Sequence, residues 1–459
     1  MSATRRHVLG SAGAVGAGIV FAGAVSELFT GAGAARAAAG GWGGHGPLVP
    51  DPDGLLDLPK GFRYRVLSRE GDPMRSGEGP VPSRHDGMAA LPGPGAGRVR
   101  LVRNHENRPD GGTYRVPAVE GLTYDPEGRG GCTLLELDRD GGVLDERVGL
   151  AGTAVNCAGG PTPWGTWLTC EETEDRAGTN GYAKDHGFVF EVGFRPDHRT
   201  VPEPLTAMGR FQHEAVAVDP RTGVVYETED AFDHPFGLFY RFLPDRPRGG
   251  FGSLRAGGRL EAMRVPGVPD LSAVLEPGTC FDGVTWVPVP DPQARRTPIR
   301  FQDFGRGGIT HAQKLEGCYW GRESVYFVSS YARSFEGSAS DHSGQVWRYD
   351  PRDRRLTLVV VFGPDTAVEL PGEAPDNICL APGGGLMVCE DGGGAQHVFG
   401  VDRRGGVHAV ARNAQNTGTP EEPQYGEFAG VTFSPDGRTL YVNCYDPGTT
   451  FAVTGPWRR

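Results

Sequence analysis

Six segments of this chain repeat one pattern of two short strands. A polar or acidic residue opens an apolar strand, a turn rich in Gly and Pro follows, and a second strand often ends in an acidic residue. The six first strands begin at His85, Asn156, His213, Leu315, Asp376 and Phe428. Alternating side chains, tight turns and about six copies of one unit are typical of a β-propeller. The sequence therefore predicts an all-β protein that folds as a six-bladed β-propeller.

The two ends of the repeat array predict how the ring closes. The last copy has room for about three strands, ending at residues 451–453, and residues 62–67 form a strand-like run before the first copy. We expect that early run to supply the outer strand of the last blade, because this would cover both exposed sheet edges. A rival architecture of two β-sandwiches leaves the polar openings of the first strands unexplained.

One stretch interrupts the series of copies. Residues 246–306, between the third and fourth copies, are rich in Pro, Gly and Arg. We expect this stretch to be a large loop insertion over one face of the propeller, and not a separate domain.

Composition narrows the class of protein and of partner. The 459 residues include 73 glycines and 38 prolines, which interrupt helices throughout and exclude a coiled coil or a helical bundle. The formal net charge is −11. We therefore do not expect the protein to bind nucleic acid, because binding a phosphate backbone requires a basic face. An acidic chain is compatible with plain solubility, or with carboxylates that converge on cations.

The first 39 residues resemble an export signal. Arg5 and Arg6 precede an apolar stretch over residues 10–25, and small residues surround Arg36. This pattern predicts a twin-arginine signal peptide over residues 1–39, with a plain secretory signal or a retained anchor as alternatives. Residues 40–459 would then form a single catalytic domain. The signal predicts a secreted or extracytoplasmic protein that engages the twin-arginine export machinery. No other segment approaches the ~20 apolar residues of a membrane span, so we expect no stable membrane span in the mature protein. We also expect the protein to be a monomer.

The polar openings predict a metal site in the channel. In a propeller the innermost strands surround one axis, so their openings meet at one mouth. Here the openings would place around the axis Asp86, Asn156, Cys157, His213, Glu214, Glu316, Asp376, Asn377 and Glu427. The ends of the second strands would add residues 104–106, 170–172, 229–230 and 390–391. Carboxylates so placed repel each other unless cations are bound, and oxygen ligands suit calcium whereas a thiolate suits a transition metal. We expect a compound metal site with Cys157 on the softer ion; the alternative is a wet polar channel with partial salt bridges to arginines.

Six motifs, in this order along the chain, resemble the PhoX-type alkaline phosphatase family. They are Arg-Asn-His-Glu at 103–106, the long run 156–172, Gly-Arg-Phe-Gln-His-Glu at 209–214, Glu-Gly at 316–317, Pro-Asp-Asn at 375–377 and Cys-Glu-Asp-Gly at 389–392. The resemblance implies a six-bladed propeller, twin-arginine export and hydrolysis of small phosphate monoesters. It also implies a cofactor of two Fe3+ and three Ca2+ ions.

The resemblance carries over to individual residues. It implies seven metal ligands, namely Cys157, Glu171, Glu172, Glu214, Glu316, Asp376 and Glu390. Asn104 matches a phosphate-contacting asparagine, and His213 is a candidate acid or a residue that orients the strand of Glu214. One position departs from the family, since Lys314 stands where the resemblance implies a phosphate-binding arginine. Lysine supplies a point charge without the bidentate fork of arginine.

Two functions from other classes remain open at this point. A calcium-dependent propeller hydrolase acting on lactones or phosphotriesters would need one catalytic metal and would have no use for Cys157. A non-catalytic binding module with structural metals would show metal-dependent stability without turnover.

Overall fold

The structure is a computed structural model that describes residues 44–195, 197–333, 337–363, 373–402 and 406–457. The predicted signal peptide over residues 1–39 lies outside the described residues. Within them, helix is confined to four short 3-10 turns, which are η2 (Thr206–Met208), η3 (Ser253–Ala256), η4 (Leu271–Ala273) and η5 (Ile299–Phe301). The described residues contain no helix with the length and apolar character that crossing a membrane would require.

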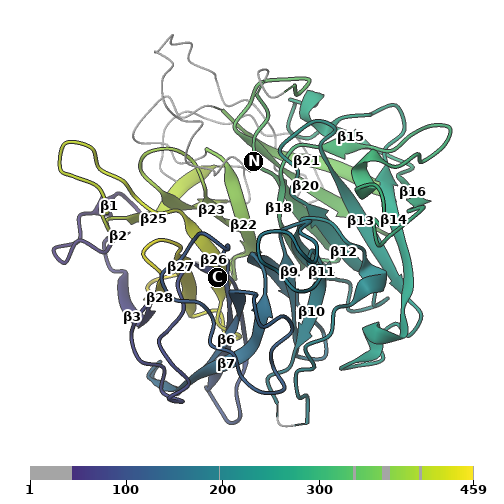
Figure 1. Cartoon of the computed structure of the whole chain (residues 1–459). Coiled ribbons are helices and arrows are strands. Elements are labelled where there is room, and N and C mark those ends of the chain that lie inside the picture. The colour runs from purple at the N-terminus through teal and green to yellow at the C-terminus, as the bar shows by residue number, and fades with distance from the viewer. Residues whose placement is uncertain (1–43, 196, 334–336, 364–372, 403–405, 458–459) are drawn as a thin grey trace.

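The described strands form six antiparallel sheets arranged around a central axis, which confirms the six-bladed prediction (Figure 1). Blade 1 contains β4 (His85–Pro92), β5 (Val99–His105), β6 (Gly130–Leu137) and β7 (Val143–Thr153). Blade 2 contains β8 (Asn156–Pro161), β9 (Trp167–Glu171) and β10 (Val189–Val192). Blade 3 contains β11 (His213–Val218), β12 (Val225–Glu229), β13 (Gly237–Pro244), β14 (Gly258–Arg264) and β16 (Thr285–Pro288), with β17 (His311–Ala312) paired to β13.

The second half of the chain builds the other three blades. Blade 4 contains β18 (Leu315–Gly321), β19 (Ser324–Ser329), β20 (Gly344–Asp350), β21 (Arg355–Phe362) and β15 (Cys280–Phe281). Blade 5 contains β22 (Pro375–Leu380), β23 (Leu386–Glu390), β24 (His397–Val401) and β25 (Val407–Asn413), followed by β2 (Leu56–Pro59) and β1 (Leu48–Val49). Blade 6 contains β26 (Phe428–Phe433), β27 (Thr439–Cys444), β28 (Thr449–Thr454) and β3 (Arg63–Arg69).

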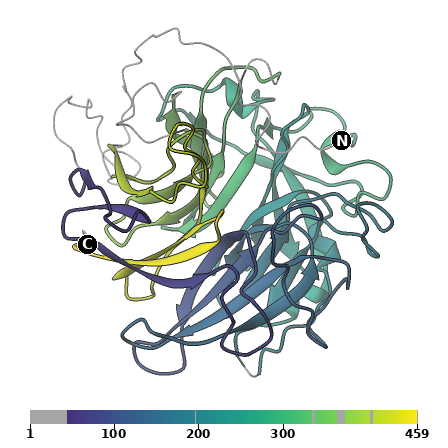
Figure 2. The same cartoon turned by 60° about the vertical axis from the view of Figure 1, so that its left-hand side comes forward.

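The ring closes as the sequence predicted. Strand β3 pairs antiparallel with β28, so that Thr454 lies opposite Arg63 and Phe451 lies opposite Val66. Figure 2 shows the early purple strand beside the late yellow one. The early segment also ties down a second blade, because β2 pairs with β25 at the outer edge of blade 5. Both pairings cover edges that would otherwise expose unpaired backbone groups.

The predicted loop insertion over residues 246–306 is not confirmed. Three strands within this stretch belong to neighbouring sheets, namely β14, β15 and β16. Strand β14 pairs with β13, β16 pairs with β14, and β15 pairs with β21 of blade 4. Its Pro and Gly residues separate very short strands, so the composition indicated turns correctly but hid the strands between them.

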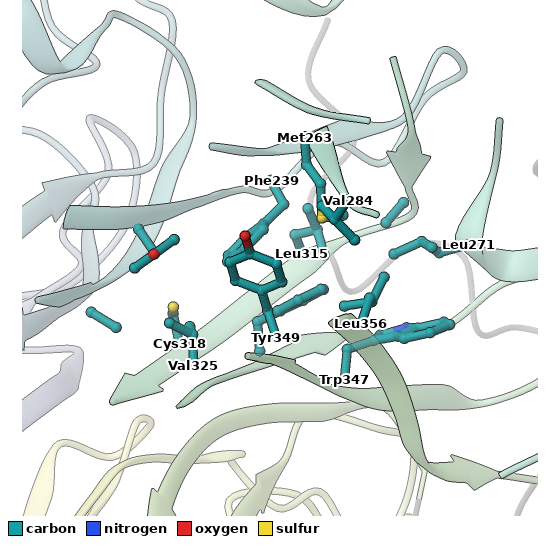
Figure 3. Packing of buried hydrophobic residues seen from close by; sticks show 14 of the residues in the cluster. Phe239, Met263, Leu271, Val284, Leu315, Cys318, Val325, Trp347, Tyr349 and Leu356 are labelled. Atoms are coloured by element: carbon teal, nitrogen blue, oxygen red, sulfur yellow. The ribbon is translucent and has the colours of Figure 1, made fainter. Parts of the chain in front are cut away.

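Apolar clusters fill the interfaces between adjacent blades. One cluster joins Phe239 and Met263 of blade 3 to Leu315, Trp347 and Leu356 of blade 4 (Figure 3). Similar clusters lie between each of the other pairs of neighbouring blades in the described residues. The first strands of adjacent blades also contact one another in an unbroken cycle, from β4 through β8, β11, β18, β22 and β26 back to β4. Two separate sandwiches would not produce this cycle.

The interface between blades 3 and 4 gives a stability prediction. Leu356 is 0% exposed, so Leu356→Ala should lower the free energy of unfolding by about 2–5 kcal/mol through lost burial and a cavity. The measurement is urea denaturation followed by tryptophan fluorescence. The matched control is Leu275→Ala, at a leucine that is 46% exposed, and it should change stability by less than about 0.5 kcal/mol. Equal effects of the two substitutions would contradict this packing.

The cysteines give a second prediction. All eight are free thiols; Cys280 is exposed and the other seven are buried. A thiol reagent such as Ellman's reagent should therefore modify one group rapidly in the native protein and eight after denaturation without reductant. Cys280→Ser should remove the rapid reaction. Fewer than eight reactive thiols in the denatured chain would show that disulfides form.

Candidate metal centre

Each first strand carries a β-bulge near its start, directly after the opening residue in blades 1 to 5 and one residue later in blade 6. The register shifts lie between His85 and Met88, Asn156 and Gly159, His213 and Val216, Leu315 and Cys318, Pro375 and Ile378, and Ala429 and Thr432. A bulge adds one residue against the partner strand, increases the local twist and redirects a side chain. The bulge positions in blades 1 to 5 are Asp86, Cys157, Glu214, Glu316 and Asp376, and the second residue of the first strand of blade 6 is Ala429. We call the five polar members the axial ring.

The axial ring is compact and buried. Its five side chains are between 0% and 3% exposed. The Cys157 Sγ lies 2.9 Å from Glu214 Oε1 and 3.8 Å from Asp86 Oδ2. Ligand atoms of Glu214, Glu316 and Asp376 all lie within 4.8 Å of one another, and so do those of Cys157, Glu172 and Glu214. Glu214 belongs to both groups, so the two groups form one continuous centre.

Glycines allow the first strands to approach so closely. A Cβ atom on Gly317, the residue after Glu316, would lie 2.7 Å from the Asp376 carbonyl oxygen. A Cβ atom on Gly87, the residue after Asp86, would lie 2.5 Å from the Ala158 Cα atom. Real Cβ atoms do not come this close to backbone, so these positions need glycine for the axial ring to assemble.

The electrostatics of the axial ring favour a bound cation. Burial and then the charges of Glu316 and Asp376 raise the pKa of Glu214 well above its usual value. Burial and then the charges of Asp86 and Glu214 raise the pKa of the Cys157 thiol in the same direction. Glu214 Oε2 is buried and has no hydrogen-bond partner among the described residues, which is costly for a carboxylate oxygen. Oxygen donors together with one sulfur suit a mixed centre of hard and softer metal ions.

Glu171 and Glu172 are adjacent in the sequence but play different parts. Glu172 lies in the group with Cys157 and Glu214. The Glu171 carboxylate instead accepts hydrogen bonds from the Ala154, Gly187 and Phe188 amides and lies 2.7 Å from His186 Nδ1. Successive side chains along a strand point to opposite faces, so only one of the pair faces the axis.

Glutamates at the ends of two other second strands also accept backbone hydrogen bonds within their own blade, and we call this arrangement a buried bracket. Glu390 accepts hydrogen bonds from the Glu373 and His397 amides and lies 2.9 Å from His397 Nδ1. Glu229 accepts from the Leu238 amide and the Tyr240 hydroxyl. In Glu171, Glu229 and Glu390 alike, the carboxylate binds the start of the third strand of its own blade. The structure therefore does not bring Glu171 and Glu390 into the axial centre.

Asn104 is also engaged away from the axis. Its amide nitrogen donates to the carbonyl oxygens of Cys157 and Ala158, at 3.0 and 2.7 Å, so both of its amide hydrogens are used. Its Oδ1 accepts from Trp167 Nε1 and from the Thr169 hydroxyl. The equivalent residue of blade 6, Asn443, binds the Asp86 carbonyl in the same way. This position clamps the ring strand of the next blade, and it offers no donor to a substrate phosphate.

His213 is a buried residue of the strand that carries Glu214. Its ring is 0% exposed, stacks on Phe211 and has Nε2 3.2 Å from the Gly209 carbonyl oxygen. Its Nδ1 lies 3.3 Å from Glu227 Oε2. Burial lowers the pKa of His213 to about 3, so the ring is neutral at physiological pH. These contacts hold the strand in place and direct both ring nitrogens of His213 toward protein groups.

Lys314 lies beside the axial ring. Its Nζ is 2.5 Å from Glu316 Oε1 and 3.1 Å from Asp230 Oδ2, and its side chain is 4% exposed. It adopts a positive φ of 41° immediately before β18, as Arg84 does at 56° before β4. Of the three predicted catalytic residues, Lys314 is the one that the structure brings to the centre.

A second tier of polar residues follows the ends of the second strands. In each blade the residue after the strand end donates its amide to the carbonyl of the residue that precedes the first-strand opening. The donors are Glu106, Glu172, Asp230, Ser330, Asp391 and Tyr445. The strand-end pattern of the sequence predicted that Glu106 and Asp230 lie at the channel mouth, but neither was among the predicted metal ligands. The alternation of side chains along a strand could have separated Glu171 from Glu172.

Comparison with known proteins identifies the family. The family model of alkaline phosphatase PhoX matches residues 43–148 and 142–448. The chain belongs to the PhoX family. The PhoX-type resemblance of its motifs is therefore confirmed, and the family supports a phosphatase hydrolase. No curated protein matches the chain in sequence.

Three solved structures similar to this PhoX family member have low sequence identity to it. They include a gluconolactonase from Xanthomonas campestris, with 12% identity, a TM-score of 0.43 and coverage of 90% of this chain and 98% of that one. A luciferin-regenerating enzyme has 11% identity, a TM-score of 0.38 and coverage of 86% and 96%. The PQQ domain of pyranose dehydrogenase from Coprinopsis cinerea has 10% identity, a TM-score of 0.37 and coverage of 88% and 98%. At these scores the likenesses carry no argument about activity.

The adjacent glutamates give a sharp test of the centre. Glu172→Gln should reduce bound metal, measured by plasma mass spectrometry, because it removes a charge that faces Cys157 and Glu214. Glu171→Gln should leave the metal content unchanged and lower the free energy of unfolding by about 1–3 kcal/mol, because it weakens a buried bracket. The two variants are matched in chemistry and chain position. Loss of metal from Glu171→Gln alone would reverse the assignment.

Proposed function

We propose that this protein is an exported phosphomonoesterase whose iron and calcium cofactor is held by the axial ring. The observation that carries the proposal is the shared position of Glu214 between two buried groups of ligands, one of which contains a cysteine. Membership of the PhoX family supports phosphatase chemistry. The twin-arginine pattern of residues 1–39 supports export.

The donor types at the axis suit iron and calcium, the metals of the proposed cofactor of two Fe3+ and three Ca2+ ions. Cys157 would hold iron through its sulfur, with Glu172 and Glu214 beside it. Glu214, Glu316 and Asp376 form an all-oxygen group that suits a hard cation. Asp86, 3.8 Å from Cys157 Sγ, extends the same centre although it was not among the predicted ligands. Glu171 and Glu390 are left out of the proposed set.

The residues around the proposed metal centre would have different roles in phosphate ester hydrolysis. When bound, the metal ions would supply positive charge against the phosphoryl group and its leaving oxygen. Lys314 supplies a further positive charge next to Glu316 and would hold a phosphate oxygen. Asn104 and His213 keep the ring strands β8 and β11 in place. Burial of the axial ring keeps bulk water from screening these charges.

The first test measures metal content and turnover on the same exported protein. We expect iron and calcium to be bound together, and we expect hydrolysis of 4-nitrophenyl phosphate. Removal of metal with a chelator should abolish the hydrolysis and lower the midpoint of thermal unfolding, because binding to the native state stabilises it. Calcium alone with hydrolysis of a lactone or a phosphotriester would favour the calcium-dependent hydrolase. Metal-dependent stability without turnover would favour a binding module.

Cys157 gives the most specific single substitution. Cys157→Ala should lower bound iron and reduce phosphatase activity about 100-fold or more, because the softer metal loses its thiolate. Cys379→Ala is the matched control, since both cysteines are 1% exposed and lie on first strands, and it should keep iron and activity. Unchanged iron in Cys157→Ala would remove this residue from the site.

A further inference from the structure

Two cationic side chains touch the carboxylates of the centre from different blades. Lys314 bridges Asp230 and Glu316 where blades 3 and 4 meet. Arg108 bridges Glu106 and Glu172 where blades 1 and 2 meet, with Nη2 2.5 Å from Glu106 Oε1 and 3.2 Å from Glu172 Oε2. The phosphatase function proposed above assigns no role to Arg108.

The two cations differ in how far they reach solvent. The Lys314 side chain is 4% exposed, whereas the Arg108 side chain is 34% exposed. The carboxylates that Arg108 bridges are themselves only 1% and 5% exposed. Arg108 therefore covers buried acidic groups and presents positive charge outward. The Arg108 side chain is therefore more accessible to an anion in solution than the two carboxylates that it bridges.

Arg108 is also close to the centre itself. Its partner Glu172 has a ligand atom within 4.8 Å of those of Cys157 and Glu214. The guanidinium is thus one carboxylate away from the group that contains the cysteine. Arginine is suited to this place because its planar fork can bind carboxylate and phosphate oxygens at once, and because it stays charged at all relevant pH values.

We propose that Arg108 binds the phosphate group of the substrate at the mouth of the channel, on a different side of the centre from Lys314. This inference rests on the proposed phosphatase function and extends it to a residue outside the predicted site. It explains how a channel rich in buried carboxylates admits a phosphate monoester, which carries the same sign of charge. A cation at the mouth offsets that repulsion and raises the rate of productive encounter.

The test compares Arg108→Ala, Arg108→Lys and Arg241→Ala in the metal-loaded, full-length exported protein. Arg241 is the matched control, because its side chain is 28% exposed and pairs with the buried Glu261 in the outer part of blade 3. We expect Arg108→Ala to raise both KM for 4-nitrophenyl phosphate and the inhibition constant of inorganic phosphate about tenfold, with kcat changed less than about twofold. Arg108→Lys should show an intermediate increase, and Arg241→Ala should show none.

Metal content is measured on every variant, so that a structural effect can be recognised. If Arg108→Ala loses metal or does not fold, Arg108→Lys decides: raised KM with full metal content supports substrate binding. Loss of metal from Arg108→Lys as well would make Arg108 a structural brace and overturn the inference. Unchanged KM and unchanged phosphate inhibition in Arg108→Ala would also overturn it, while leaving the phosphatase function intact.

Absence of turnover in the parent protein would instead refute the phosphatase function. Titration calorimetry with inorganic phosphate on the same proteins then decides about Arg108. Phosphate binding that is weakened in Arg108→Ala and retained in Arg241→Ala supports the anion site. Equal binding in the two variants, or no binding to the parent, overturns it.

Discussion

Burial of like charges around one axis is the constraint on which the rest of this structure depends. Five first strands place Asp86, Cys157, Glu214, Glu316 and Asp376 together, nearly without solvent. Burial and mutual repulsion raise the pKa values of Glu214 and Cys157, so the protein by itself does not favour their charged forms. Bound cations would favour the charged forms, which is the physical link between this arrangement and the proposed metal centre.

The propeller can accommodate buried acidic groups at the axis because apolar packing between the blades stabilises the fold. The apolar clusters lie between the blades, at a distance from the axis, and the early strand β3 completes blade 6. Buried brackets such as Glu171 with His186 fix the strand ends. Clamps such as Asn104 on the Cys157 carbonyl hold the bulged strands in register. The ring residues are thus positioned by neighbours that have no direct role in binding a ligand.

Polar residues around the axis lie in two tiers, to which the proposed function assigns metal binding and contact with the substrate. The lower tier is the axial ring itself. The upper tier follows the second strands and includes Glu106, Glu172 and Asp230, whose charges are matched by Arg108 and Lys314. Cations that bridge two carboxylates are held firmly, yet one of them remains partly open to solvent. In the proposed phosphatase, this partly exposed cation would attract an anionic ester.

The sequence by itself determined the six-bladed all-β fold and its closing strand, because strand alternation and turn residues are local signals that repeat along the chain. Its motifs also identified the family. Only the tertiary structure decided which polar residues meet, since Glu172 faces the axis and Glu171 does not. It also showed that the Asn104 amide donates to backbone carbonyl oxygens. Residues 246–306 were found to add strands to blades 3 and 4. The physical reason is that a bulge and a pleat set the direction of each side chain, and that direction is fixed only when the neighbouring strand is in place.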